Sequence, residues 1–273
     1  MKLKEVFFGL GLKPRAREYG FDIQRFMLEK DGEIEYAAWR HPKEKPKQFY
    51  QAQIDALRGF LSAGDYALDI GAHTGDSTLP IALALGASGG VLALEPNPHV
   101  YKILVANAGL NKQKTNIQPL MFAATVEDGE MDFEYSDAGF CNGGLHKDIS
   151  PWTHAHFFKL RVRGRNLLRF LERECPDVMR KIRYVKIDAE GYDPDVAHSI
   201  RALLQQNRPF IKTEIYKHLP SERRRQYLRE LQGLGYRLYK WESEENYRGQ
   251  LITDSDADKW PHYDVFAVPS DSQ

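Results

Sequence analysis

Short apolar runs alternate with helix-period segments from Tyr66 onward, and this alternation constrains the fold more than any other feature of the sequence. The run YALDI precedes an Ala/Leu-rich segment over residues 77–85, and VLALEP precedes a segment over 99–108 with apolar residues at helical spacing. Further strands are expected in NIQPLMFAATV, YVKIDAEG and FIKTEI, and Asp193-Pro194 begins a helix between the last two. Strands that alternate with helices form a parallel sheet covered by helices. The sequence therefore predicts an α/β protein.

Both ends of the chain depart from this rhythm. Before HPKEKPK at 41–47, Asp31-Gly32 separates two β-prone runs and predicts a hairpin with a type I′ turn. A helix is expected from about Tyr50 to Gly64. The runs YRLYKWE and YDVFAVP predict an antiparallel pair at one edge of the sheet. We therefore expect an N-terminal hairpin extension over 1–46 and a main domain over 47–273.

An insertion over residues 129–165 also breaks the rhythm. It contains two expected strands, MDFEY and FFKLRVR, around a loop rich in Gly and His. In a doubly wound sheet such an insertion lies over the carboxyl ends of the strands, where ligands bind. We predict a lid, with Asn142, His146 and His154 as candidate substrate contacts, while a plain exposed loop is the alternative.

Charge and composition exclude several classes of function. Lys plus Arg and Asp plus Glu both number 38, so no whole-molecule basic field is available to hold a nucleic acid or an anionic membrane. The apolar runs are shorter than the roughly 20 residues of a membrane span, and no secretory signal is expected at the N-terminus. The two cysteines, Cys141 and Cys175, are too few for a disulfide framework. We expect a cytoplasmic protein.

The stretch LDIGAHTGDS at 68–77 carries the most specific chemical signal. Gly71 and Gly75 allow a tight turn and a close approach of a ligand to the start of the next helix. The spacing lacks the second glycine of a dinucleotide-binding G-x-G-x-x-G, and Asp69 would repel a pyrophosphate but suit an ammonium group. Glu95 ends the next strand, where an acid can accept both hydroxyls of a ribose. S-adenosylmethionine therefore fits better than NAD.

Other interpretations of the same residues stay open. The two acids can cap helices and the two glycines can simply turn the chain, without binding any ligand. An NAD-dependent oxidoreductase on a Rossmann-like fold and a non-catalytic partner subunit that keeps the fold are the functional alternatives. The oxidoreductase differs from a methyltransferase in the cofactor it binds, and the non-catalytic subunit differs in having no activity. Measurements of cofactor binding and of activity therefore distinguish these alternatives.

Three strings together resemble a known family: LDIGAHTGDS, LEPNPHVYKILVANAGLN and VKIDAEGYDPDV. They resemble the FkbM-type branch of class I S-adenosylmethionine-dependent methyltransferases, with the pattern D-x-G-A-N-x-G, then E-P, then K-x-D-x-E-G. The resemblance implies a Rossmann-like, seven-stranded and mostly parallel sheet whose last strand is antiparallel. It also implies O-methylation of a hydroxyl on a sugar, polysaccharide or glycosylated natural product. His73 stands where the pattern more commonly has Asn.

The resemblance also assigns site residues by position. The candidate cofactor-binding residues are Asp69, Gly71, Ala72, His73, Gly75, Asp76, Thr78, Glu95, Pro96, Asn97, Ala123 and Ala124. Of these, Glu95 would bind the ribose and Ala123 or Ala124 would lie beside the adenine. The expected partner is a small-molecule or glycan hydroxyl acceptor, and the aromatic-rich hairpin is a candidate substrate wall or homodimer contact.

Three carboxylates are the candidate catalytic residues. The fourth strand is expected to end in Asp188-Ala189-Glu190-Gly191, where alternation points Asp188 and Glu190 to the same side, and Glu214 ends the fifth strand next to them. Either one of them takes the proton from the attacking hydroxyl, or the group holds Mg²⁺ or a similar ion that lowers the hydroxyl pKa. The remaining interpretation is a salt-bridge layer with Lys186 and Lys212.

Overall fold

A twisted, mostly parallel sheet organises the chain in the computed structural model, which describes residues 17–135, 139, 141, 143–144 and 158–271. Within these residues the sheet has eight strands, in the order β13-β12-β14-β11-β10-β3-β4-β5. They are β3 (Tyr66–Ile70), β4 (Gly90–Leu94), β5 (Ile117–Leu120), β10 (Ile182–Ile187), β11 (Phe210–Ile215), β12 (Tyr236–Lys240), β13 (Leu251–Ile252) and β14 (Tyr263–Pro269). Only β13 and β14 run against the other strands of this sheet. The predicted α/β class and the antiparallel last strand are confirmed, and the two-residue β13 makes the count eight instead of seven.

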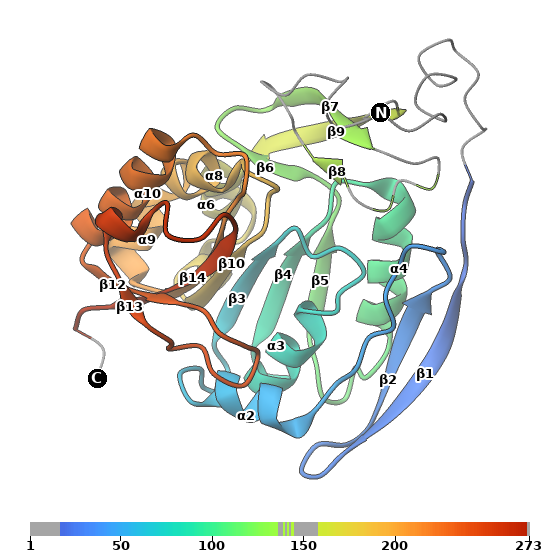
Figure 1. Ribbon diagram of the computed structural model, residues 1–273. Coiled ribbons are helices and arrows are strands. Elements are labelled where there is room, and N and C mark those ends of the chain that lie inside the picture. Colours follow the sequence, from blue (N-terminus) through green and yellow to red (C-terminus); the bar gives the residue numbers. More distant parts are fainter. Residues whose placement is uncertain (1–16, 136–138, 140, 142, 145–157, 272–273) are drawn as a thin grey trace.

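Helices cover both faces of this sheet (Figure 1). They are α2 (Gln51–Arg58), α3 (Thr78–Leu85), α4 (Pro98–Gly109), α6 (Leu167–Glu174), α7 (Pro176–Met179), α8 (Asp193–Ser199), α9 (Arg201–Asn207) and α10 (Ser221–Gly233), with a short 3-10 helix η1 (Asp254–Asp256). Leu68 and Ile70 belong to the apolar cluster that includes α6, α8, α9 and α10, whereas Ala67 and Ala93 pack with α2 and α3. Because both faces are buried, the central strands are mostly apolar, and β4 (GVLAL) is apolar throughout. Among the described residues, no helix is both long and apolar enough to span a membrane.

The segment 116–126 forms two strands where the sequence predicted one. Residues 117–120 are β5 at the edge of the main sheet, and β6 (Ala123–Thr125) belongs to a second sheet of order β6-β9-β7-β8. Its other strands are β7 (Gly129–Tyr135), β8 (Gly143–Gly144) and β9 (Phe158–Asn166). The expected pair within the insertion is confirmed, because β7 and β9 pair antiparallel from Gly129 to Tyr135.

The N-terminal hairpin consists of β1 (Phe21–Leu28) and β2 (Gly32–Trp39) and lies alongside α4 (Figure 1). The predicted type I′ turn is wrong. The turn is formed by residues 29–31, and Gly32 has φ of +68° whereas Asp31 has no positive φ. Three-residue loops are the next most common hairpin connections, and here the left-handed Gly32 follows the loop as the first residue of β2. This loop suits the chain because the Asp31 carboxylate is held by Arg58 and Gln51 of α2.

Buried hydrogen bonds connect the hairpin to the loop after β3. Tyr36 Oη lies 2.7 Å from Thr74 Oγ1. Asn107 of α4 donates from Nδ2 to the carbonyls of Thr74, at 2.7 Å, and of Ala37, at 3.1 Å, and its Oδ1 accepts from Ala37 N at 2.6 Å. One buried amide therefore joins the hairpin, α4 and this loop.

Two predicted helices differ from the structure at their ends. The helix expected from about Tyr50 to Gly64 is α2, which already ends at Arg58. The helix expected from Asp193 is interrupted at Ile200, so α8 and α9 are separate. Asp193 is the first residue of α8, and Tyr192 is the N-cap of this helix. The Asp193 side chain accepts hydrogen bonds from the preceding turn and from β11.

Candidate active site

A cavity of about 480 Å³ lies at the carboxyl ends of β3, β4 and β10. These strands flank the point where the strand order reverses, which is where doubly wound sheets bind ligands. Its walls come from the loop after β3, the loop after β4, the turn after β10, strands β6 and β7, and the segment between β2 and α2. Strand β7 of the insertion therefore contributes to the cavity wall, while ligand binding in this cavity stays a prediction.

The loop after β3 is folded by three residues with positive φ. Gly71 has φ of +79°, His73 of +49° and Gly75 of +93°. The backbone N–H groups of Gly71 and Ala72 both donate to Leu94 O, at 3.0 and 2.9 Å, which fixes the loop against the end of β4. A Cβ at position 71 would lie 2.0 Å from the carbonyl oxygen of Asp188. Only glycine satisfies both the conformation and the packing at this position.

Glu95 follows β4 and points its carboxylate toward the cavity wall. Its side chain is almost completely buried, and its two oxygens accept from His73 N at 3.0 Å and Asn97 N at 2.8 Å. Burial raises the pKa of Glu95, although the nearby His73 ring and the two N–H donors act in the opposite direction. Asn97 in turn caps α4 by accepting from His99 N at 2.9 Å. The orientation of this acid is therefore set by both loops.

Asp69 occupies a different environment from the one that its sequence position suggested. The side chain is fully buried and does not line the cavity. Its Oδ2 accepts from the hydroxyls of Ser77, at 2.8 Å, and Thr78, at 2.6 Å, and its Oδ1 lies 3.3 Å from Lys186 Nζ. Asp69 thus holds the start of α3 and one lysine, and its role toward an amino group stays a prediction.

Lys186 of β10 lies at the centre of a buried charge network. Its Nζ is 3.3 Å from Asp188 Oδ2 as well as from Asp69, and it donates to Gly71 O at 3.3 Å. Burial lowers the pKa of Lys186, but attraction to Asp69, Asp188 and Asp76 outweighs burial, so the pKa is raised overall. The lysine therefore stays positively charged at the wall of the cavity.

The positive charge of Lys212, in β11, does not pair with any of the three candidate catalytic carboxylates. Its Nζ pairs with Glu244 at 3.4 Å and Asp264 at 3.3 Å and lies 3.7 Å from the centre of the Trp241 ring. The expected salt-bridge layer therefore exists in part: Lys186 pairs with Asp188, and Lys212 pairs with residues of the C-terminal segment.

The turn after β10 carries two of the candidate catalytic residues. The strand ends at Ile187, so the expectation that Asp188 and Glu190 share one side of an extended strand is wrong. Glu190 and Gly191 instead have φ of +51° and +100°, and they turn the chain into α8. Asp188 and Glu190 still both line the cavity. Burial, followed by repulsion from Asp188, raises the pKa of Glu190.

Glu214 lies in β11, outside the cavity lining. Its Oε1 is 3.1 Å from His262 Nε2, while Oε2 is buried and, within the described part of the chain, has no hydrogen-bond partner. Burial, with repulsion from Asp193 and Asp188, raises the pKa of Glu214 to about 9. One carboxylate oxygen of Glu214, a ring nitrogen of His262 and a carboxylate oxygen of Asp264 lie within 4.8 Å of one another, and neither Asp188 nor Glu190 belongs to that group among the described residues.

Asp193 organises the turn after β10, a role that sequence reasoning missed. It is fully buried and accepts from the backbone N–H groups of Ala189, Gly191 and Glu214, each at 3.2 Å. Burial, followed by repulsion from Asp188, raises its pKa to about 7. Its acceptor contacts reach backward to Ala189 and Gly191 and across to Glu214, so no local turn pattern marks this role in the sequence.

The segment between β2 and α2 also reaches the site, although its sequence marked only the boundary between the hairpin and the main domain. Lys43, Glu44, Lys45 and Lys47 line the cavity. Lys47 Nζ lies 2.6 Å from Asp76 Oδ2, and this lysine lowers the pKa of Asp76 in spite of burial, which acts to raise it. No local pattern marks these residues, because their contacts depend on how the hairpin packs against the main sheet.

The predicted site residues divide into three groups. The expected cofactor residues that line the cavity are Gly71, His73, Asp76, Glu95, Pro96, Asn97, Ala123 and Ala124, whereas Asp69, Ala72, Gly75 and Thr78 lie behind the wall. The candidate substrate contacts Asn142, His146 and His154 lie outside the described residues.

Several solved structures are similar to this chain at low sequence identity. An S-adenosylmethionine-dependent O-methyltransferase of Thermotoga maritima is 15% identical, with a TM-score of 0.42 over 93% of this chain and 79% of that one. A methyltransferase FkbM of Methylobacillus flagellatus is 13% identical, with a TM-score of 0.40 over 74% of this chain and 43% of that one. Aeropyrum pernix fibrillarin with natively bound S-adenosylmethionine is 13% identical, with a TM-score of 0.42 over 93% and 95%.

No curated protein matches the sequence. The model of the methyltransferase FkbM domain, however, matches residues 69–238, which is more than half of the chain. The matched region includes the loop after β3, Glu95 and the turn after β10, and it favours methyl transfer over NAD-dependent oxidation. The chain belongs to the FkbM family of class I S-adenosylmethionine-dependent methyltransferases.

Proposed function

We propose that this protein transfers a methyl group from S-adenosylmethionine to a hydroxyl of a carbohydrate or of a glycosylated small molecule. The observation that carries the proposal is the placement of Glu95 and of the pair Asp188 and Glu190 on walls of one cavity, on two sides of the glycine loop that begins at Gly71. The first acid suits a ribose, and the pair suits a reacting hydroxyl.

The residues of the cavity fit the cofactor by their chemistry. Glu95 offers carboxylate oxygens with lone pairs beyond those used by His73 N and Asn97 N, so it can accept from two ribose hydroxyls. Phe122, Ala123 and Ala124 provide an apolar wall for an adenine ring. When bound, S-adenosylmethionine supplies the methyl group from a sulfonium centre. The protein's own contribution is to hold the two ends of the cofactor apart and in a fixed orientation.

Glu190 is the proposed proton acceptor. Its raised pKa makes it a better base than an ordinary carboxylate, because a base is most effective when its pKa approaches the working pH. Asp188 is half-exposed and pairs with Lys186, so it is suited to accept a hydrogen bond from the acceptor and orient it. Glu214 does not line the cavity and pairs with His262, so we assign it no direct part in proton transfer.

Positioning is expected to supply most of the rate enhancement. Displacement at a methyl carbon requires the oxygen, carbon and sulfur to lie in line, and such orientation can contribute about 7–11 kcal/mol at best. Phe133 and Tyr135 of β7 line the cavity and help to exclude water. We propose that the whole insertion over 129–165 acts as the lid of the 47–273 domain, with Asn142, His146 and His154 contacting the acceptor.

A divalent cation at Asp188 and Glu190 is the competing mechanism. The base mechanism is favoured because Lys186 already places a positive charge 3.3 Å from Asp188. Full activity after treatment with EDTA is expected if a carboxylate alone takes the proton, whereas restoration of lost activity by Mg²⁺ would establish the metal mechanism instead.

The cofactor assignment is tested by ligand-dependent thermal unfolding. S-adenosylhomocysteine at about 100 times its dissociation constant should stabilise the fold by about 2.7 kcal/mol, and NADH should not. Transfer of labelled methyl to members of a sugar and glycoside panel then tests the reaction. Stabilisation by NADH alone would refute the cofactor assignment. Cofactor binding without transfer to any hydroxyl acceptor of that panel would instead support a non-catalytic subunit.

A homodimer through the outer face of β1, where Phe21, Ile23 and Met27 are exposed, stays a prediction.

A further inference from the structure

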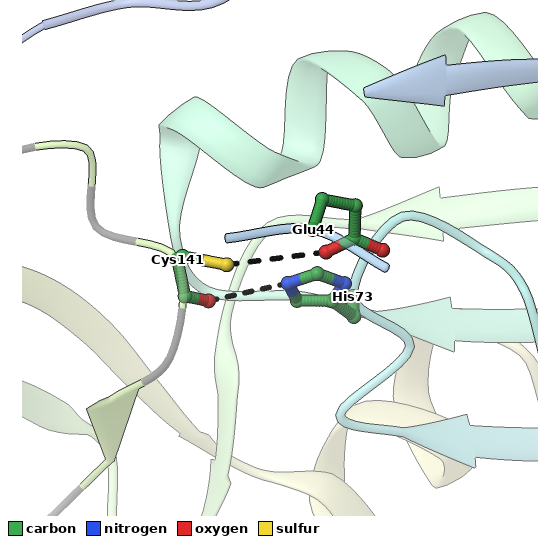
Figure 2. Close-up of side chains that lie close together, drawn as sticks. All are labelled: Glu44, His73 and Cys141. Atoms are coloured by element: carbon green, nitrogen blue, oxygen red, sulfur yellow. Dashed lines mark hydrogen bonds between the residues drawn. The ribbon is translucent and has the colours of Figure 1, made fainter. Parts of the chain in front are cut away.

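Glu44, His73 and Cys141 converge on one wall of the cavity, although they are far apart in the sequence (Figure 2). Each offers a metal-binding atom, and these three atoms lie within 4.8 Å of one another. Cys141 Sγ is 3.9 Å from Glu44 Oε2, and His73 Nε2 is 3.2 Å from the Cys141 carbonyl oxygen. Neither Glu44 nor Cys141 has a role in the proposed methyl transfer.

Three separate parts of the fold fix these side chains. Glu44 follows β2 in a turn closed by its N–H bond to His41 O at 3.0 Å. His73 has φ of +49°, a conformation that only the packed loop after β3 maintains. Cys141 is buried against the apolar cluster that contains Trp39 and Val100. The arrangement is therefore a product of tertiary structure and not of a flexible surface.

We propose that Glu44, His73 and Cys141 form a binding site for a divalent transition-metal ion of the zinc class. Thiolate, imidazole and carboxylate are the three donor types that Zn²⁺ uses in proteins. Bond lengths of about 2.0–2.3 Å place the ligand atoms of a tetrahedral site about 3.5 Å apart, so the three donors need to move together by only about 1 Å. The carbonyl of Cys141 orients the imidazole, as outer partners of metal-binding histidines do.

The ion would have an open coordination position toward the ligand space. All three residues line the cavity, and three protein ligands with one free position are typical of catalytic and not of structural zinc sites. That position can take water or an oxygen of a bound small molecule. The site is separate from the carboxylates after β10, because neither Asp188 nor Glu190 belongs to this group.

Lys47 is the group that competes with the metal ion. Its Nζ lies 2.9 Å from Glu44 Oε1, which is buried and has no hydrogen bond of normal geometry among the described residues. The same Nζ lies 2.6 Å from Asp76 Oδ2. Lys47 can therefore keep Asp76 as its partner while Glu44 binds the ion. Lys43 and Lys45 also line the cavity, so binding requires the negative charge of the thiolate as well as that of Glu44.

The test uses the full-length protein, Zn²⁺ for affinity and Co²⁺ as a spectroscopic probe, with no S-adenosylmethionine present. One equivalent of Co²⁺ should give a near-ultraviolet thiolate charge-transfer band, which Zn²⁺ displaces. Cys141→Ser should abolish the band, and Glu44→Gln should weaken Zn²⁺ binding by at least about tenfold, because one of three protein ligands is lost. Cys175→Ser, at the other cysteine, is the matched control and should retain both properties.

X-ray absorption on the Zn²⁺-loaded Cys175→Ser protein keeps the test valid if Cys141→Ser does not fold. One sulfur at about 2.3 Å and a histidine nitrogen at about 2.0–2.1 Å are expected. A coordination sphere without sulfur, a band that survives Cys141→Ser, or the absence of stoichiometric binding would each overturn the site. Metal bound without sulfur and lost in His262→Gln would assign the ion to Glu214, His262 and Asp264. None of these measurements depends on methyl transfer, so their outcome tests the metal site independently of the proposed function.

Discussion

Replacement of Lys186 by methionine should destabilise the protein because it strands a buried carboxylate. The lysine side chain is 9% exposed, and its Nζ lies 3.3 Å from Asp69, whose side chain is 0% exposed. Removing one partner of a buried ion pair costs about 3–5 kcal/mol, since the remaining charge is left without compensation. For a domain of this size that corresponds to a fall in melting temperature of roughly 6 to 20 °C. Chemical and thermal unfolding of Lys186→Met at neutral pH measures both quantities.

Two further variants separate this mechanism from a simple loss of packing. Asp69→Asn in the Lys186→Met background removes the stranded charge, so the double variant should be more stable than Lys186→Met alone. Lys181→Met is the control at an exposed lysine, with an expected change within about 0.5 kcal/mol. The deficit of Lys186→Met should also shrink as the pH falls, because the stranded carboxylate can take up a proton. Additive effects of the two substitutions, or a deficit that does not change with pH, would refute the argument.

Three other predictions concern the acids of the site. Glu95→Gln should raise the Michaelis constant for the cofactor more than it lowers kcat, and the opposite pattern would contradict its assignment to the ribose. Because the pKa of Glu190 is raised, kcat/KM should rise with pH through that pKa, and Glu190→Gln should lower kcat and remove this limb of the pH profile. The pKa of Glu214 is raised from 4.5 to about 9, so the stability that it contributes is complete below pH 4.5 and is lost as the pH rises toward 9. Glu214→Gln should therefore flatten the dependence of melting temperature on pH over this range, and an unchanged slope, or an equal flattening in the exposed control Glu222→Gln, would contradict the assignment.

Burial on both faces is what made the central sheet readable in the sequence. Strands 66–70 and 90–94 are mostly apolar, with Asp69 the one charged residue in them, and the helix between them is buried along its whole length. The division of 117–125 between two sheets was not readable, because β-prone residues continue across Met121 and Phe122. Which sheet a strand joins is decided by distant partners, here β4 for one half and β9 for the other.

Site residues at the ends of strands could be predicted from the sequence, whereas those placed by tertiary packing could not. Glu95 and Asp188 follow strands that the sequence located, so their positions at the cavity followed from topology. The turn at Glu190 was missed because positive φ at a non-glycine residue has no clear sequence signature. Lys47 was missed because its partner Asp76 is 29 residues away and meets it only after the hairpin has packed.

The amide of Asn107 gives the N-terminal hairpin a mechanical connection to the ligand space. Because one side chain binds both Ala37 and Thr74, a displacement of β2 has to be transmitted to the glycine loop or break buried hydrogen bonds. A molecule that binds the outer strand β1 and displaces the hairpin would therefore change the affinity for the methyl donor without entering the cavity.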